Sequence, residues 1–248
     1  MPFIPKHQHY VRAPIKEALI GLGMDRPSSS ALADLARLDL SARGYSGPRN
    51  IYRTQLEGRI EGDQATAKAD HGQVGYQFIG EDGRHVARID LDSFAFSRLP
   101  PYDSWEQLRE EAHTIWNSYR SVIPGRAVTR VGLRYINQID MPQPVRDFRD
   151  YIRTYPEISS DLPQAVAGFF FQVQIPLEPS GVFLSLTQAL VPPSAPNVTS
   201  VVLDIDVFRQ GMRLESDDEI WRILDELRLQ KNLVFESCIT DRTRELIS

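Results

Sequence analysis

The sequence contains a single cysteine, Cys238, among 248 residues. One thiol cannot close an internal disulfide, which excludes a disulfide-stapled secreted scaffold and makes the cytoplasm the expected compartment. The chain does not open on a charged start, an apolar run and a small-residue cleavage site, and no apolar run approaches the roughly 20 residues that cross a bilayer. We therefore expect a cytoplasmic protein that has no membrane partner.

Positive charge is not in excess. The chain has 28 Lys and Arg against 33 Asp and Glu, so its formal charge is −5. A surface for nucleic acid or for an anionic membrane needs a basic excess to neutralise phosphate groups. The arginines that dominate the cations are scattered along the chain rather than clustered. The charge balance thus argues against nucleic acid as a partner.

Motifs for catalysis are missing as well. The segment GLGMDR at Gly21 has the first two glycines of a dinucleotide-binding loop but lacks the third. The segment GYSGP at Gly44 does not have the glycine spacing of a nucleophile elbow, and no P-loop, HExxH or paired CxxC motif occurs. We predict no catalytic residue, no cofactor and no metal. An enzyme assembled from scattered residues is the alternative that the sequence leaves open.

A repeated phrase is what the sequence does contain: RIDLDSF at residues 88–94 and VLDIDVF at residues 202–208. In each half, alternating and helical spacings of apolar residues predict a strand, a short helix, three strands and a long helix. We therefore predict an α+β fold that arose by tandem duplication of a β-α-β-β-β-α unit. The units occupy residues 1–125 and 126–248 of one compact protein, with antiparallel sheets backed by long helices on one face.

The helices follow from capping signals and apolar spacing. The first long helix is predicted to begin at a capping box of Asp103 and Glu106. The segment PVRDFRDYI at residues 144–152 is predicted to be the short helix of the second half, with its proline in the first turn. The last segment, DRTRELI, is predicted to be a short helix capped by Thr240 and Asp241.

Alternation along the repeated strand places Arg88, Asp90, Asp92 and Phe94 on the face that no helix covers. Guanidinium groups bind carboxylates and other anions, and amides supply hydrogen bonds, so this face can bind a partner protein or a small anionic ligand. The predicted binding residues on this face are Arg88, Asp90, Asp92, Arg130, Arg134, Gln138, Gln172, Gln174, Asp204 and Asp206. The alternative is an ordinary solvated face of an antiparallel sheet.

The acids of the repeated phrase raise the question of a metal. Two carboxylates at positions i and i+2 of a strand point to the same side and can chelate Mg²⁺ or Ca²⁺. The sequence marks no third or fourth oxygen ligand, and Arg88 and Arg134 can neutralise the acids instead. A metal-dependent hydrolase or nuclease is therefore the least favoured hypothesis.

Four segments, YVRAPIKEALI, YDSWEQL, RVGLRYINQID and FESCITDRTRELI, occur in this order over the whole chain. On these segments the chain resembles a family of sporadically distributed, uncharacterised prokaryotic proteins of similar length, and GLRYIN is the most specific match. The resemblance implies no established activity. The patchy occurrence of the family implies traffic with mobile elements, and hence a setting in a defence island or a toxin-antitoxin-like operon.

The residues that the resemblance selects are Tyr10, Pro14, Glu17, Arg134, Tyr135, Asn137, Glu236, Thr240 and Asp241. Alternation places Asn137 on the apolar side of its strand, where we predict a buried amide that bonds backbone groups. Arg134 is the residue of this set that we expect to carry a function.

The leading hypothesis is a non-catalytic binding protein that binds a partner protein through the polar sheet face. It would serve as an accessory or regulatory component of a prokaryotic defence or toxin-antitoxin-like system. The alternative is a sensor of a nucleotide or another anionic metabolite that uses Arg130 and Arg134 as forks. Self-association through open sheet edges is a further possibility.

Overall fold

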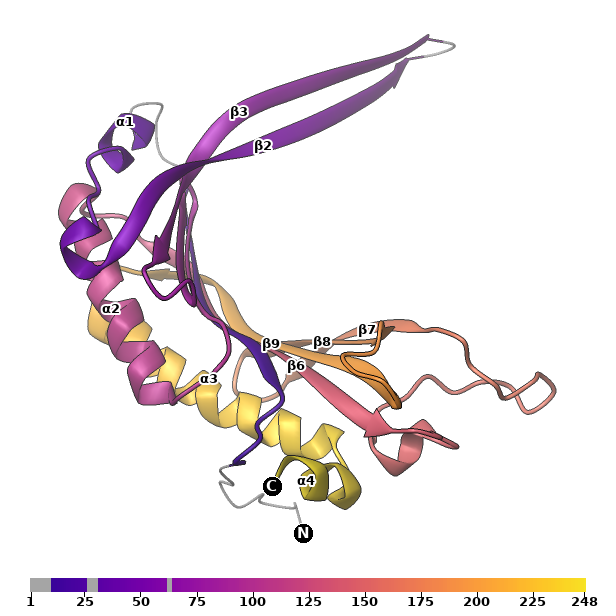
Figure 1. Ribbon diagram of the computed structural model, residues 1–248. Helices are drawn as coiled ribbons and strands as arrows, with labels where there is room; N and C mark the ends of the chain where they lie inside the picture. Colours follow the sequence, from indigo (N-terminus) through magenta and orange to yellow (C-terminus); the bar gives the residue numbers. More distant parts are fainter. Residues whose placement is uncertain (1–9, 26–30, 62–63) are drawn as a thin grey trace.

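The computed structural model describes residues 10–25, 31–61 and 64–248 of the chain. The strands that it describes form one antiparallel sheet in the order β2-β3-β4-β5-β1-β6-β9-β8-β7 (Figure 1). Their bounds are β1 (Ile15–Met24), β2 (Tyr45–Glu61), β3 (Gln64–Gly80), β4 (His85–Asp90), β5 (Ser93–Arg98), β6 (Val128–Pro142), β7 (Phe170–Leu177), β8 (Val182–Val191) and β9 (Val198–Leu214). The sheet is continuous because β1 lies between β5 and β6 and pairs with both.

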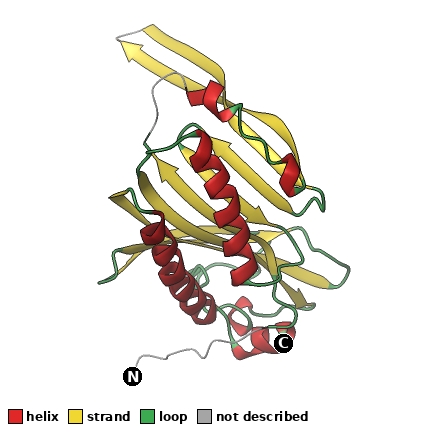
Figure 2. Ribbon diagram, turned by 90° about the vertical axis from the view of Figure 1, so that its left-hand side faces the viewer, coloured by secondary structure: helices red, strands yellow, loops and turns green. Residues whose placement is uncertain are grey.

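Two long helices cover one face of this sheet, as Figure 2 shows. The helices are α1 (Ala31–Leu35), α2 (Trp105–Val122), α3 (Asp217–Cys238) and α4 (Asp241–Ile247), with 3-10 turns η1 (Ser41–Arg43) and η2 (Phe148–Asp150). Within the described ranges, no helix is both long and apolar enough to cross a bilayer.

Helix α2 forms where apolar residues recur at helical spacing. Its buried residues are Trp105, Leu108, Ala112, Ile115, Trp116 and Tyr119. Ser104 caps the helix, because its side-chain oxygen accepts a hydrogen bond from the backbone nitrogen of Gln107 at 3.2 Å. The predicted cap at Asp103 was therefore one residue early.

The strands at the centre of the sheet separate an apolar side from a polar side. Ile20 on β1, Leu133 on β6 and Ile205 on β9 are fully buried on the helix side. Alternate residues of β6 and β9 face the other way, where no helix lies. Figure 1 shows that the sheet is curved, with α2 and α3 on its convex side and the long β2–β3 hairpin projecting from it. The uncovered concave side is called the open face below.

The predicted fold, a tandem duplication of a β-α-β-β-β-α unit, is wrong. The described strands form one sheet, with five strands before residue 125 and four after it. The stretch predicted as one strand around residues 85–99 is two strands, because the chain bends at Leu91 and Asp92. Residues 144–152 contain the 3-10 turn η2 and an isolated bridge from Ile152 to Ile239, and no α-helix. The repeated phrase thus spans a bend in the first half and an uninterrupted strand in the second.

Two predictions from local chemistry are confirmed. Thr240 caps α4, since its side-chain oxygen accepts from the backbone nitrogen of Thr243 at 3.4 Å. Asn137 is a buried amide whose Nδ2 donates to the carbonyl of Leu203 at 3.0 Å. Both residues stabilise the fold through backbone groups.

Candidate functional site

Arg134 on β6 and Asp204 on β9 form a two-point ion pair on the open face. The Nε and Nη2 atoms of Arg134 donate to the two carboxylate oxygens of Asp204 at 2.8 and 2.6 Å. These hydrogen bonds raise the pKa of Arg134. The Arg134 side chain is 44% exposed, whereas that of Asp204 is 11% exposed. The Arg134 guanidinium group, which was expected to bind an anion, is therefore already bound to the carboxylate of Asp204.

Arg130, four residues before Arg134 on β6, also forms an ion pair on the open face. Its Nη2 donates to Asp206 at 2.8 Å, and its guanidinium carbon lies 4.4 Å from the ring centroid of Phe208. Gly132 allows this, because a Cβ atom there would lie 2.5 Å from the Arg130 guanidinium. Burial raises the pKa of Asp206, and the charge of Arg130 opposes that rise. Arg130 is thus also paired within the face.

The glutamines of the open face make local hydrogen bonds. Gln138 Nε2 donates to Asp140 Oδ1 at 3.1 Å, and Gln172 Nε2 donates to Thr187 Oγ1 at 3.1 Å. Gln174 is exposed on the edge strand β7, opposite Ser185 of β8. Along β6 to β7 the predicted binding residues lie together, but most of them bond one another.

The acids of the first half lie at the end of β4 and in the bend after it. Asp90 and Asp92 both contact Arg53 of β2, at 3.3 and 3.5 Å, and Arg88 Nε lies 3.7 Å from Asp90. Asp90 is nearly buried, and this burial raises its pKa. Among the described residues, no group of three or more His, Cys, Asp and Glu is placed to hold a metal ion.

Phe94 was predicted to lie beside these acids, and that prediction is wrong. Its ring is fully buried on the helix side, with its centroid 5.2 Å from that of Trp116 on α2. The bend at residues 91–92 breaks the alternation of the strand, so β5 starts on the opposite phase.

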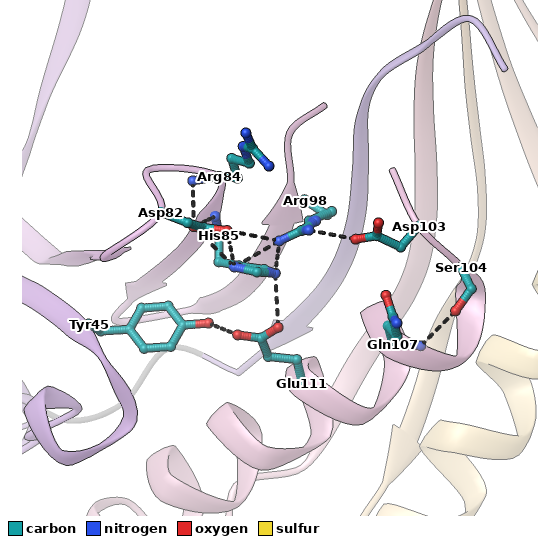
Figure 3. A network of polar contacts seen from close by, with 9 residues as sticks. All are labelled: Tyr45, Asp82, Arg84, His85, Arg98, Asp103, Ser104, Gln107 and Glu111. Atoms are coloured by element: carbon teal, nitrogen blue, oxygen red, sulfur yellow. Dashed lines mark hydrogen bonds and ion pairs between the residues drawn. The ribbon is translucent and has the colours of Figure 1, made fainter. Parts of the chain in front are cut away.

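A polar network joins α2 to the edge of β4 and β5 (Figure 3). Glu111 of α2 accepts a hydrogen bond from Tyr45 Oη at 2.5 Å and lies 3.0 Å from His85 Nε2. Arg98 lies between two carboxylates, 3.2 Å from Asp82 and 2.5 Å from Asp103. A hollow of about 310 Å³ adjoins this network. His85 and Arg98 both have carboxylate partners, so the network stabilises the packing of α2 against the sheet.

A larger cavity, of about 740 Å³, lies on the helix side of the sheet. It is bounded by residues 10–15, by residues 100–106 and by α3, and β6 supplies its floor. Aromatic side chains that line it are Tyr10, Tyr102, Trp105, Tyr135 and Phe235. Its rim exposes apolar side chains: Val11 is 83%, Leu229 is 55% and Leu233 is 38% exposed. A volume of this size is typical of small-molecule sites, which measure about 300 to 1,000 Å³.

Residues from four distant segments, YVRAPIKEALI, YDSWEQL, RVGLRYINQID and FESCITDRTRELI, meet at this cavity. Tyr10 and Pro14 come from the first, Tyr102 from the second, Tyr135 from the third and Glu236 from the fourth. Tyr10 Oη donates to Glu236 Oε1 at 2.7 Å across 226 residues of sequence. The hydroxyl groups of Tyr102 and Tyr135 are 2.7 Å apart. The segments are thus far apart in the chain and adjacent in space.

The carboxylates of the cavity are each bound to an arginine. Asp103 lies 2.5 Å from Arg98, Glu106 lies 3.0 Å from Arg228, and Glu236 lies 2.8 Å from Arg244. Burial raises the pKa of Tyr10 to about 12, and a hydrogen bond to Glu236 adds to this effect. Burial also raises the pKa of Tyr102 to about 12. The phenols are therefore neutral donors at physiological pH.

Lys231 of α3 differs from these groups. Its Nζ atom lies 3.8 Å from the ring centroid of Tyr135, on the floor of the cavity. Among the residues that the structure describes, no carboxylate oxygen lies within the 4.0 Å ion-pair distance of this ammonium. Burial lowers the pKa of Lys231 to about 7, the positive charge of Arg228 lowers it further, and the negative charge of Glu236 opposes both effects. Within the described structure the cavity thus contains a cation that has no carboxylate at ion-pair distance.

Sequence reasoning missed Lys231, although the chain carries a signal for it. Lys231 falls in the apolar stripe of α3, four residues after Leu227 and three before Val234. A lysine at a position that should face the sheet is expected to be partly removed from water. Arg53 was also missed, because its contact with Asp90 depends on the pairing of β2, β3 and β4.

A scan against protein-family models and a search of curated proteins found no match to this chain.

Proposed function

We propose that this protein is a non-catalytic binding protein whose cavity holds a small anionic molecule with an apolar body. The observation that carries the proposal is the position of Lys231, an amine without a carboxylate partner in the described structure, on the floor of a 740 Å³ cavity. An anionic group of a ligand would supply the charge that the cavity itself does not.

The residues that line the cavity indicate the chemistry of the rest of the ligand. Rings of Tyr135, Trp105 and Phe235 and the exposed side chains of Leu229 and Leu233 offer apolar contact. Pockets that combine such walls with a few convergent polar groups and a residue of shifted pKa are typical binding sites. This arrangement favours an aromatic or branched carboxylate, sulfonate or phosphate over a sugar or a bare inorganic ion.

The expected setting follows from the family resemblance. A sporadically distributed prokaryotic protein that binds a metabolite without turnover fits a sensor or an accessory component of a defence or toxin-antitoxin-like system. Cytoplasmic location is part of the proposal. Cys238 supports it, because this thiol is buried and burial raises its pKa to about 11, which suits a reduced, unreactive cysteine.

The test compares two fluorescent probes that share an apolar body. One, 8-anilinonaphthalene-1-sulfonate, carries an anionic group, and the other, N-phenyl-1-naphthylamine, does not. Lys231→Met is expected to weaken binding of the sulfonate at least tenfold and to change binding of the neutral probe less than twofold. Lys16→Met is the matched control, because Lys16 is exposed on β1 and loses the same charge. Equal sulfonate affinity in both variants would overturn the proposal.

A partner protein on the open face is the second candidate function. Phe170 of the edge strand β7 is 73% exposed and points to the same side as the exposed Gln172 and Gln174. An aromatic ring among uncharged amides resembles the contact residues of protein interfaces.

This second function is tested by purifying tagged protein from its host and weighing the eluate by native mass spectrometry. Phe170→Ser combined with Gln174→Glu is expected to lose the partner. Leu162→Ser is the control, since Leu162 is 58% exposed in the loop before β7 and belongs to no strand of the sheet. A partner retained equally by both variants would exclude the open face, and a dimer mass lost only in the first variant would identify the partner as a second copy.

A further inference from the structure

Lys231 is surrounded by groups that leave its amine free to react. The groups around the cavity come from four places. Arg228 and Glu236 lie on the same helix as Lys231, and Tyr135 lies on β6. Tyr102 and Asp103 precede α2, Glu106 lies in its first turn, and Tyr10 and Arg12 lie on the N-terminal segment. The three acids in this set are bound to arginines. Arg12 Nε donates to the carbonyl oxygen of Ser248 at 3.1 Å. The remaining groups are neutral phenols, so the surroundings repel a second positive charge more than they attract it.

An amine in such surroundings is a nucleophile at neutral pH. The neutral form of an amine attacks carbonyl carbon, and desolvation or a neighbouring cation is what makes this form available. Burial and Arg228 have this effect on Lys231, whose pKa falls to about 7. An ordinary lysine, with a pKa near ~10.4, is almost entirely protonated at that pH.

We infer that Lys231 captures the aldehyde or ketone group of an anionic oxo compound as a reversible imine. This inference rests on the proposed function, because it names the chemical class of the molecule that occupies the same cavity. The ligand class is an oxo acid with an apolar body, whose carbonyl group reaches Lys231.

The step balances without any further reagent. The lone pair of Nζ attacks the carbonyl carbon, and the C–O double bond opens to give a carbinolamine. The oxygen then leaves with the two protons of the nitrogen as one water molecule, and a C–N double bond forms. No electron passes to or from a third molecule, so neither oxidant nor reductant is needed.

The cavity also supplies a hydrogen-bond donor for the carbonyl oxygen, because one of two phenols that bond each other keeps a proton to donate. The hydroxyl groups of Tyr102 and Tyr135 lie 2.7 Å apart, and the ring of Tyr135 contacts the Lys231 ammonium at 3.8 Å. Burial raises the pKa of both phenols, so they keep their protons at neutral pH. A phenol that stays protonated can polarise a carbonyl group and stabilise the carbinolamine oxygen.

The experiment uses 4-formylbenzoate, an aromatic aldehyde with a carboxylate, followed by borohydride, which converts an imine to a stable secondary amine. Peptide mapping by mass spectrometry then measures the labelling of each lysine in the full chain. At pH 7, Lys231 is expected to be labelled at least tenfold faster than Lys16. Its rate should level off above about pH 8, whereas that of a solvated amine keeps rising.

Two further measurements separate this inference from the proposed function. Lys231→Arg keeps the positive charge but cannot form a neutral nucleophile, so it should retain sulfonate-probe binding and lose the labelling. Equal labelling of Lys231 and Lys16, together with a sulfonate affinity that depends on Lys231, would overturn the imine alone. If Lys231 is labelled selectively but Lys231→Met does not change the affinity for the sulfonate probe, the proposed anionic ligand is wrong and the capture of a carbonyl group is supported.

Discussion

The open face and the cavity lie on opposite sides of the same sheet, and they differ in whether their cations are paired with acids. On the open face, Arg134 is bound to Asp204 and Arg130 to Asp206. In the cavity, the acids are bound to arginines and Lys231 has no carboxylate within ion-pair distance in the described structure. A surface with many charged residues can thus be balanced within itself, whereas one unbalanced cation in an apolar cavity indicates a binding site.

The paired charges of the open face and the unpaired amine of the cavity are expected to affect the stability of the fold differently. A buried acid that has its arginine stabilises the fold only as long as the pair is complete. An amine that is largely removed from water and has no acid at ion-pair distance lowers stability, and groups that lower stability are common at functional sites. Three substitutions test this difference, from the largest expected effect to the smallest.

Arg134→Met is expected to lower the free energy of unfolding by about 3 kcal/mol, because it leaves the nearly buried carboxylate of Asp204 unpaired. Urea denaturation at pH 7 measures the change. The double variant Arg134→Met with Asp204→Leu should recover to within about 1 kcal/mol of the wild type, since an apolar pair can replace an ion pair. A single variant as stable as the wild type would mean that the pair is an ordinary surface contact.

Lys231→Met is expected to raise the free energy of unfolding by about 2 kcal/mol at pH 7, after allowance for the partial exposure of this amine. The folded protein gives up the proton near pH 7, whereas the unfolded chain holds it to about pH 10.4. The unfolded state therefore binds more protons between these values, and wild-type stability rises with pH across that window. The advantage of the variant should shrink to about half at pH 9 in urea denaturation.

The sign of this change is what distinguishes the two sides of the sheet. A Lys231→Met variant that is less stable than the wild type at both pH 7 and pH 9 would show that Lys231 is balanced in solution, and the contrast with Arg134 would fail.

Arg53→Gln is expected to have the smallest effect, a loss of about 0.5 kcal/mol at pH 7, because the Arg53 side chain is 40% exposed. Arg53 acts on the ionised form of Asp90, whose pKa is raised by burial. The loss should therefore disappear as the pH falls and Asp90 takes up a proton. Arg49→Gln, on the same strand and exposed, is the control. Equal losses at pH 3 and pH 7 would mean that Arg53 acts through packing.

Local elements of this fold could be predicted because each follows from a short pattern. The apolar spacing of α2 and the Thr240 cap of α4 are properties of a few consecutive residues. The predicted duplication was wrong because the two similar segments adopt different structures. The first bends at Asp92, whereas the second is a continuous strand at Asp206. Residue identity does not tell a bend from a strand when the neighbouring strands decide.

The candidate site could be predicted only in part. The open-face residues follow from alternation along β6 and β9, but whether Arg134 is free or bound depends on the register of the two strands. The cavity depends on contacts such as Tyr10 with Glu236, which join the two ends of the described chain. Lys231 falls within the apolar stripe of α3, and only the folded structure shows that no described carboxylate lies within ion-pair distance of it.

Strand β6 contributes residues to both the open face and the cavity. Arg134 and Tyr135 are neighbours in sequence, and one faces the open side while the other forms the floor of the cavity. The amide groups of β6 are bonded to β1 on one edge and to β9 on the other. Slower hydrogen–deuterium exchange in β6 would therefore report a molecule bound on either side. The exchange rates that tell the two sides apart lie elsewhere, in α3 for the cavity and in β7 for the open face.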